Sequence, residues 1–137
     1  MTEYNKPVPL PGPISEPFFE GAKRHELMLM RCSSCGVYRL AERPSCPECW
    51  SDDYEWVKGS GRGSIYSYVI MHQQLHPAFA DDIPYNVAVV ELEEGPRMVS
   101  NIIGCGNEEL HVGQPVEVVF DNITEDCTIP RFRPRSD

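Results

Sequence analysis

The sequence contains no long hydrophobic run. A membrane-spanning helix needs about 20 consecutive apolar residues, and no segment of this 137-residue chain comes close to that length. Near the N-terminus the only compact apolar segment is Leu27–Met30, which is too short for the core of a secretory signal peptide. From these absences we expect a cytoplasmic protein with no membrane partner.

Basic residues are also scarce. Lysine and arginine number 12 against 21 aspartates and glutamates, which gives a formal net charge of −9. Proteins that bind nucleic acids gain much of their affinity from Lys and Arg side chains that neutralise phosphates. Two acidic segments, 72–83 and 121–127, contain no Lys or Arg at all. We therefore expect no nucleic-acid partner, and keep nucleic-acid binding only as the alternative function.

Four of the six cysteines form two Cys-x-x-Cys pairs. Cys32 pairs with Cys35, and Cys46 pairs with Cys49, with ten residues between the pairs. Each such turn presents two thiolates to one ion, and two turns together supply the tetrahedral set that zinc prefers. A closed set leaves no position for water, so the spacing predicts one structural zinc ion per chain. Two disulfides, or four unrelated thiols, are the alternative.

No combination of side chains in the sequence defines a catalytic centre. Cys105 and Cys127 stand outside the quartet and are expected to be buried, apolar thiols. A catalytic histidine beside one of these thiols would need a base within hydrogen-bond reach of the nucleophile, which a sequence does not reveal. We assign no catalytic residue, and keep a subunit with catalytic residues of its own as a further alternative.

The pattern of prolines, apolar residues and glycines divides the chain into three parts. Residues 1–14 form an extended proline-rich arm, residues 15–58 form a helix and a zinc ribbon, and residues 59–137 form a barrel with a basic C-terminal tail. Ser15 is the expected N-cap of a helix over 16–26. The expected strands are 27–31, 37–40, 65–71, 85–92, 97–103, 116–120 and 127–132, with a linker near 56–60 and a helical turn over 107–110.

The second half has the element order of an OB-fold. Five strands with a short helix between the third and fourth are typical of this Greek-key barrel, and a small β-sandwich is the alternative. Segment 85–92 is almost continuously apolar, which is typical of a strand covered on both faces. The predicted fold class is mainly β, with an N-terminal helix and zinc ribbon followed by a five-stranded OB-fold barrel.

The order of several motifs resembles a known family. A Phe-Phe-Glu helix start leads into Cys-x-x-Cys-Gly, Cys-Pro-x-Cys and Gly-Arg-Gly-Ser-Ile-Tyr-Ser-Tyr, and the segments 76–79, 83–85, 91–97 and 130–134 follow in order. This arrangement resembles the rubredoxin-like zinc-ribbon plus OB-fold proteins of domain-of-unknown-function family thirty-five. The resemblance covers about residues 15–135. Trp50, in a position where ribbons often have glycine, is a departure, and we expect it to cap the metal site or to pack toward the second half.

The resemblance implies a function that composition does not. Members of that family are non-catalytic partners of thiolases, hydroxymethylglutaryl-CoA synthase, thiolase-like acyltransferases or retro-aldolases, and they help to form the acyl-CoA site. It therefore implies a hetero-oligomer with a thiolase-like acyl-CoA enzyme, in which a coenzyme A thioester is a shared ligand.

Two further groups of residues are candidate ligand sites. The phosphates of coenzyme A need cationic partners, and the basic edge of Arg131, Phe132 and Arg133 is the expected coenzyme A contact, with Phe132 as a wall beside the nucleotide. A solvated C-terminus is the alternative. His76, Phe79 and Tyr85 belong to the loop after the first barrel strand, where OB-folds often bind ligands. They are the candidate interface or ligand loop, against a loop that simply packs on the barrel.

Overall fold

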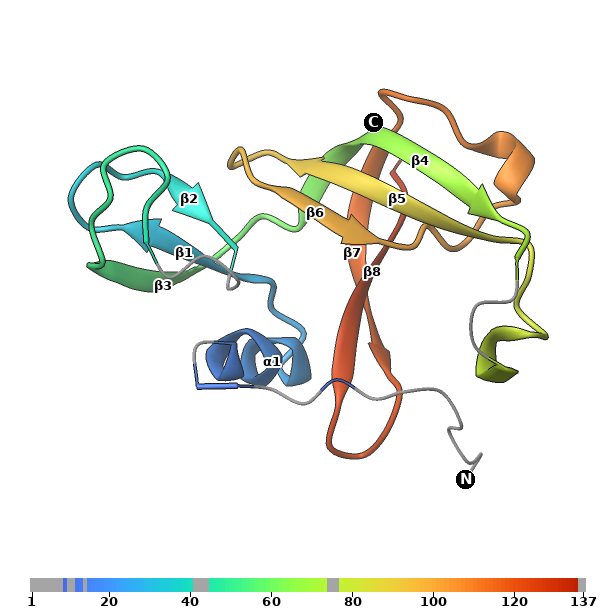
Figure 1. Ribbon diagram of the computed structural model, residues 1–137, viewed down its shortest axis with the longest axis horizontal. Coiled ribbons are helices and arrows are strands. Elements are labelled where there is room, and N and C mark those ends of the chain that lie inside the picture. Colours follow the sequence, from blue (N-terminus) through green and yellow to red (C-terminus); the bar gives the residue numbers. More distant parts are fainter. Residues whose placement is uncertain (1–8, 10–11, 14, 41–44, 74–76, 136–137) are drawn as a thin grey trace.

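The computed structural model describes residue 9 and residues 12–13, 15–40, 45–73 and 77–135. Most of the predicted arm, 1–14, lies outside the described residues. A small zinc ribbon lies at the left of Figure 1, the helix lies beneath it, and a curled sheet forms the right half. The order of elements is α1 (Glu16–Lys23), β1 (Met28–Cys32), β2 (Tyr38–Arg39), β3 (Tyr54–Lys58), β4 (Arg62–Met71), η1 (Pro77–Phe79), β5 (Tyr85–Leu92), β6 (Arg97–Ser100), η2 (Asn107–Glu109), β7 (Pro115–Asn122) and β8 (Thr128–Pro134).

Helix α1 ends at Lys23, three residues before the predicted end. The chain leaves the helix because His25 adopts a left-handed conformation, with φ of 62°. The N–H of His25 donates to the carbonyl of Ala22, and the N–H of Glu26 donates to the carbonyl of Gly21, both at 2.9 Å. This is the paired hydrogen-bond pattern of a Schellman C-cap. At the other end Ser15 occupies the N-cap position without a capping side-chain bond, and its hydroxyl accepts instead from the N–H of Gly12.

The ribbon is a three-stranded antiparallel sheet in the order β2-β1-β3. The prediction missed β3 and treated part of it as a linker. Yet β3 pairs with β1 along its full length, from Met28 opposite Lys58 to Cys32 opposite Tyr54. The strand has no clean apolar alternation, because its side chains are half-buried or exposed, so its pairing comes from the tertiary fold rather than from a local pattern.

The second half is a five-stranded antiparallel sheet in the order β6-β5-β4-β7-β8. It curls until the segment after β6 meets β8, where Ile102 and Phe132 form a parallel bridge. The 3₁₀ turn η2 lies between the third and fourth strands of this sheet, as predicted. The OB-like fold class is confirmed.

Strand β6 is shorter than predicted and ends at Ser100 instead of residue 103. The reason is the buried side chain of Asn86 on β5, which accepts from the N–H of Ile102 at 2.7 Å and donates to its carbonyl at 2.8 Å. The amide side chain of Asn86 thus takes the place of a neighbouring strand in bonding the backbone of Ile102, and the chain turns toward β8 at this point.

One hydrophobic core joins the ribbon to the barrel. Leu27, Leu29 and Leu40 from the ribbon half belong to the same buried cluster as the inward side chains of the barrel. The barrel side chains in this cluster are Ile65, Ala88, Val90, Leu92, Met98, Ile102, Leu110, Val116 and Phe132. At the junction the N–H of Gly59 donates to the carbonyl of Leu27 at 2.7 Å. In the part of the chain that the structure describes, no helix has the length and apolar character needed to cross a bilayer.

Candidate metal centre and docking face

The four predicted ligands converge at the tip of the ribbon. The sulfur atoms of Cys32, Cys35, Cys46 and Cys49 all lie within 4.8 Å of one another. The Sγ atoms of Cys32 and Cys49 are 3.6 Å apart, and those of Cys35 and Cys46 are 3.5 Å apart. A disulfide would need about 2.05 Å, whereas zinc with bonds of about 2.3 Å holds sulfurs near 3.8 Å apart. The cluster is positioned to bind a metal and fits a tetrahedral ion.

Backbone donors prepare part of the cluster for a cation. Hydrogen bonds from the backbone of Cys35 and then Ser34 lower the pKa of Cys32 to about 6, and the backbone of Cys49 lowers the pKa of Cys46. At Cys35 the backbone of Val37 acts in the same direction, but desolvation and the neighbouring sulfurs outweigh it and raise the pKa to about 12. Backbone hydrogen bonds thus favour the thiolate form at Cys32 and Cys46, and a bound dication would favour it at all four cysteines.

The two cysteine turns have the same backbone design with different residues at their ends. Gly36 follows the first pair and donates to the carbonyl of Cys32, and Trp50 follows the second pair and donates to the carbonyl of Cys46, each at 2.9 Å. Both residues are left-handed, with φ of 81° and 65°. The left-handed region costs an L-residue with a side chain roughly 1–2 kcal/mol. Trp50 is also 79% exposed, so the expectation that it packs on the metal site or on the second half is wrong.

The predicted coenzyme A edge divides into three different environments. Phe132 is fully buried in the barrel core, so its ring packs the fold and offers no surface to a nucleotide. Arg131 is half-buried and bonded to Asp121 and Asn101. Arg133 is exposed, with one longer contact to Glu117 at 3.4 Å. Of the three, Arg133 has the side chain best placed to meet a ligand, and its role stays a prediction.

The predicted loop residues are only partly described. His76 lies outside the described residues, and Phe79 ends the 3₁₀ turn η1, with its side chain outside the described part. Tyr85 begins β5 directly opposite Met71 of β4. It is half-buried on the outer side of the sheet, next to a surface that the sequence interpretation missed.

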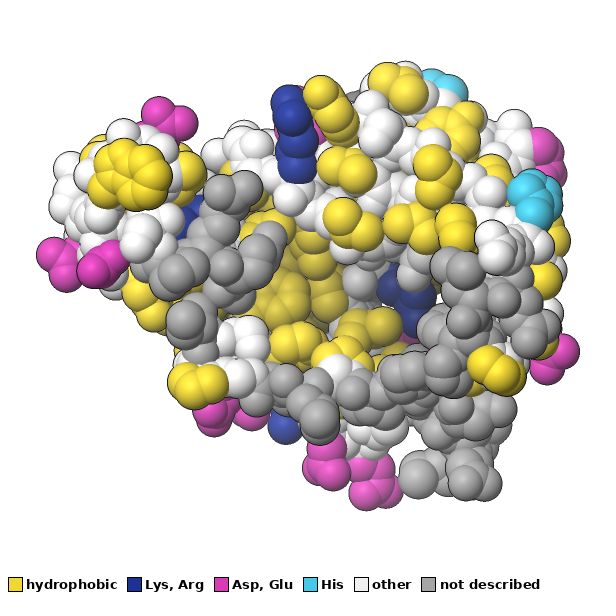
Figure 2. All heavy atoms as spheres, viewed as in Figure 1, with side chains coloured by type: hydrophobic (Ala, Val, Ile, Leu, Met, Phe, Trp, Pro, Cys, Tyr) yellow, Lys and Arg dark blue, Asp and Glu magenta, His cyan; other side chains and the backbone are white. Residues whose placement is uncertain are grey.

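That surface is the outer face of β4, β5 and β6. Four valines, Val69, Val87, Val89 and Val99, form what we call the valine face. Val69 lies opposite Val87, and Val89 lies opposite Val99. Val69 and Val99 are 56% and 67% exposed. Figure 2 shows apolar side chains spread over this sheet at the upper right, and a hollow with an apolar floor between the sheet and the ribbon.

The apolar run of β5 was the signal for this face. A continuous run predicts a strand covered on both sides. Its inward residues Asn86, Ala88, Val90 and Leu92 are buried, while the alternate residues remain partly exposed. The chain therefore covers one side of β5 and leaves the other without cover from its own described residues.

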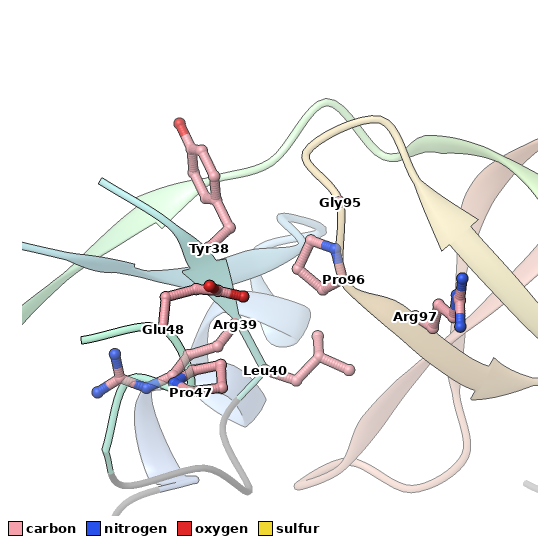
Figure 3. Close-up of a pocket in the computed structure, with 8 residues that line it drawn as sticks. All are labelled: Tyr38, Arg39, Leu40, Pro47, Glu48, Gly95, Pro96 and Arg97. Atoms are coloured by element: carbon pink, nitrogen blue, oxygen red, sulfur yellow. The ribbon is translucent and has the colours of Figure 1, made fainter. Parts of the chain in front are cut away.

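A pocket of about 460 Å³ separates β2 from the β5–β6 turn. In Figure 3 the side chain of Leu40 and the ring of Pro96 lie between these two elements, and Arg97 points away from the ribbon. Glu48 and Arg39 bring opposite charges to the lining. The guanidinium of Arg39 lies 5.1 Å from the ring centre of Tyr54, where it belongs to the ribbon's own packing.

The two remaining thiols, Cys105 and Cys127, both have a raised pKa. Burial raises the pKa of Cys127, against a small opposing effect from Lys23. Burial, and then the carboxylates of Glu109 and Glu108, raise the pKa of Cys105. An activated cysteine nucleophile needs the opposite shift.

A ribbon with four converging cysteines, joined through one core to an OB-like fold, defines a two-part zinc-ribbon and OB-fold protein. Comparison with known proteins identifies its family. Residues 19–55 match the ChsH2 rubredoxin-like zinc ribbon domain, and residues 56–121 match the ChsH2 C-terminal OB-fold domain. The chain belongs to the DUF35 family of ChsH2-type zinc-ribbon and OB-fold proteins.

The chain is similar in sequence to several named proteins. The chain is 37% identical to a DUF35 domain-containing scaffold protein of Methanocaldococcus jannaschii, over 76% of this chain and 74% of that protein. It is 40% identical to a probable enoyl-CoA hydratase alpha subunit of Thermomonospora curvata over 85% of its own length, but spans only 36% of that longer relative. It is 30% identical to the benzoylsuccinyl-CoA thiolase subunit BbsA of Thauera aromatica, over 61% of this chain and 60% of that subunit.

A solved structure supports the same family. The chain matches a chain of the Ltp2-ChsH2(DUF35) aldolase with a TM-score of 0.81 and 38% identity, over 92% of this chain and 98% of the other. The family resemblance and the mainly β, ribbon-plus-barrel architecture predicted from the sequence are therefore confirmed.

Proposed function

We propose that this protein is a non-catalytic accessory subunit of an acyl-CoA-processing enzyme, and that it binds a thiolase-type subunit through the valine face. The observation that carries the proposal is the exposure of Val69 and Val99 on a sheet face whose central strand has the composition of a fully covered strand. Apolar patches of this kind mark interaction sites on soluble proteins.

The margin of the valine face has the polar character of an interface rim. Arg97 bonds Glu91 at 3.2 Å and stacks on the ring of Tyr66, with its guanidinium carbon 3.8 Å from the ring centre. Arg62 and Glu93 form another exposed ion pair at 3.5 Å. Stable interfaces commonly combine an apolar centre with such a polar border.

The relatives supply the class of partner. One relative is named as a benzoylsuccinyl-CoA thiolase subunit, and others are named as scaffold proteins. By analogy, this chain would bridge or stabilise an enzyme and contribute Arg133 to the binding of a coenzyme A thioester. A bound zinc ion at the four cysteines would stabilise the ribbon. Its role would be structural, because a saturated coordination sphere leaves no position for substrate.

A second partner class has its own support. The structural match at 38% identity is to an aldolase complex. An aldolase that cleaves a carbon–carbon bond in an acyl-CoA is therefore the second candidate partner, for the same docking face and the same accessory role.

Co-expression with each class of enzyme tests the proposal. We expect the chain to co-elute with a thiolase-type subunit, to raise its activity, and to show no acyl-CoA turnover alone. The double variant Val69→Asp/Val99→Asp should abolish co-elution, because two charges would be buried in the interface. Val112→Asp is the matched control, since Val112 is 66% exposed outside the valine face. Unchanged assembly of the double variant would refute the docking face, and turnover by the isolated chain would establish an enzyme.

A further inference from the structure

Trp50 occupies a backbone position that suits glycine. Gly36 has the equivalent place in the first cysteine turn, with the same hydrogen bond back to the first cysteine of its pair. Glycine adopts the left-handed conformation with little strain, whereas a bulky side chain is disfavoured there. The local structure therefore explains a glycine at position 50, and it does not explain a tryptophan.

A second left-handed residue, His25, differs from Trp50 because its side chain contacts the rest of the fold. His25 also has a positive φ. Its ring stacks on Phe120 with ring centres 5.2 Å apart, and its Nε2 lies 3.4 Å from Oδ1 of Asn122. The side chain of His25, although exposed, thus contacts the barrel just beyond the end of helix α1.

The indole of Trp50 has no comparable packing. The side chain is 79% exposed, more than that of any other large hydrophobic residue that the structure describes as exposed. In the isolated chain, the left-handed backbone and the exposed aromatic ring each raise the free energy of the folded state. Backbone strain that no contact within the fold offsets is a reason to look for function.

Trp50 lies in an acidic stretch of the sequence, although Arg31 of β1 pairs with one of its carboxylates, that of Glu55, at 3.2 Å. From Ser45 to Glu55 the sequence contains Glu48, Asp52, Asp53 and Glu55, and no Lys or Arg. Glu48, Asp52 and Asp53 are all exposed, and four thiolates around a zinc dication would add a formal charge of about −2. Figure 2 shows acidic side chains around the ribbon lobe at the left. A partner surface that meets this tip should carry basic residues.

We propose that Trp50 is an anchor through which the ribbon tip binds a second protein subunit, with its indole in an apolar pocket bordered by Lys or Arg side chains. This inference rests on the proposed function, because it takes the partner to be the acyl-CoA enzyme subunit. Tryptophan is among the residues most enriched at interface hot spots, and such rings insert into desolvated pockets. The ribbon tip and the valine face are then two contacts of one partner.

The test compares the affinities of full-length chains for the separately purified thiolase-type subunit, measured by titration calorimetry. We expect Trp50→Gly to weaken binding about 30-fold or more, while the isolated variant keeps its zinc and unfolds at the same or a higher temperature. Val112→Ala, at an exposed site on the barrel, should bind like the wild type. Affinity should also fall as salt rises, because the charges around the anchor are exposed.

A second measurement reports on the indole itself. The chain has two tryptophans, so Trp56→Phe leaves Trp50 as the only fluorotryptophan in a labelled chain mixed with unlabelled partner. Its fluorine resonance should shift on binding. Wild-type affinity of Trp50→Gly, or an unshifted resonance in the complex, would overturn the anchor while leaving the proposed function in place. If the wild-type chain binds no acyl-CoA enzyme subunit, the proposed function and this inference both fail.

Discussion

Arg131 donates from Nε to Oδ2 of Asp121 at 2.8 Å, across the pair of strands β7 and β8. The same guanidinium donates from Nη1 to Asn101 at 2.7 Å. It therefore ties the last hairpin to the segment that closes the barrel. Its neighbour Arg133 is exposed, and among the described residues its side chain contacts Glu117 at the longer distance of 3.4 Å. Two arginines that look equivalent in the sequence have different roles in the structure.

We expect Arg131→Ala to lower the free energy of unfolding by about 1–3 kcal/mol, because hydrogen bonds to charged groups are among the stronger ones. The Arg131 side chain is only 21% exposed, so solvent screens this pair less than a surface pair. Arg133→Ala should change stability by well under 1 kcal/mol. Urea unfolding of the isolated chain compares the two variants. A loss of well under 1 kcal/mol for Arg131→Ala as well would show that the contacts of Arg131 add little to the fold.

Arg133→Ala should instead affect the assembled enzyme. If Arg133 contacts a phosphate of coenzyme A, its loss should raise KM for the acyl-CoA about 5- to 30-fold and leave kcat nearly unchanged. A higher KM with an unchanged kcat would mean that Arg133 binds the substrate equally strongly in the ground state and in the transition state. Arg24→Ala is the matched control, since the Arg24 side chain is as exposed as that of Arg133 and likewise pairs with a glutamate, Glu26. Unchanged kinetics in an intact complex would make Arg133 a solvated surface residue.

Much of the fold follows from local patterns, and some of it does not. The four cysteines and the strand alternation are short-range signals, so the metal cluster and most strands could be located from sequence. Strand β3 has no such signal, and its pairing with β1 emerges only from the tertiary structure. The burial of Phe132 did have a signal, because side chains alternate along a strand and two outward arginines place the residue between them on the inner face.

The predicted site residues show the same limit. Sequence spacing brings the cysteines together, because each pair lies within one tight turn. The apolar run of β5 hinted at the valine face, but its full extent depends on the register of three strands, which no single segment encodes. The exposure of Trp50 was equally hidden, although glycine at the matching position of the first turn indicated that a left-handed residue was needed.

Removal of the metal should unfold the ribbon. We expect one zinc ion per chain by elemental analysis, and loss of that zinc in Cys46→Ser. Structural zinc supplies apparent binding energies on the order of 10–16 kcal/mol, which is comparable to the stability of a whole domain. Leu27, Leu29 and Leu40 should then lose their place in the shared core, so limited proteolysis should cut the ribbon half first. Cys105→Ser should keep its zinc and resist the protease, and a well-folded sample without stoichiometric metal would contradict the prediction.

The thiols outside the metal cluster should react slowly with iodoacetamide at pH 8. Burial raises the pKa of Cys105 and of Cys127, and a raised thiol pKa leaves less of the reactive thiolate at a given pH. Their alkylation rates, followed by mass spectrometry of the labelled peptides, should therefore keep rising at pH values where the alkylation of free cysteine has levelled off. Glu109→Gln removes one negative charge that raises the pKa of Cys105, so it should speed alkylation at Cys105 and leave Cys127 unchanged. If Cys105 reacts at pH 8 as fast as free cysteine, its pKa is not raised; if it reacts faster, its thiol is activated, and the proposal of a non-catalytic subunit would have to give way to one with a nucleophile of its own.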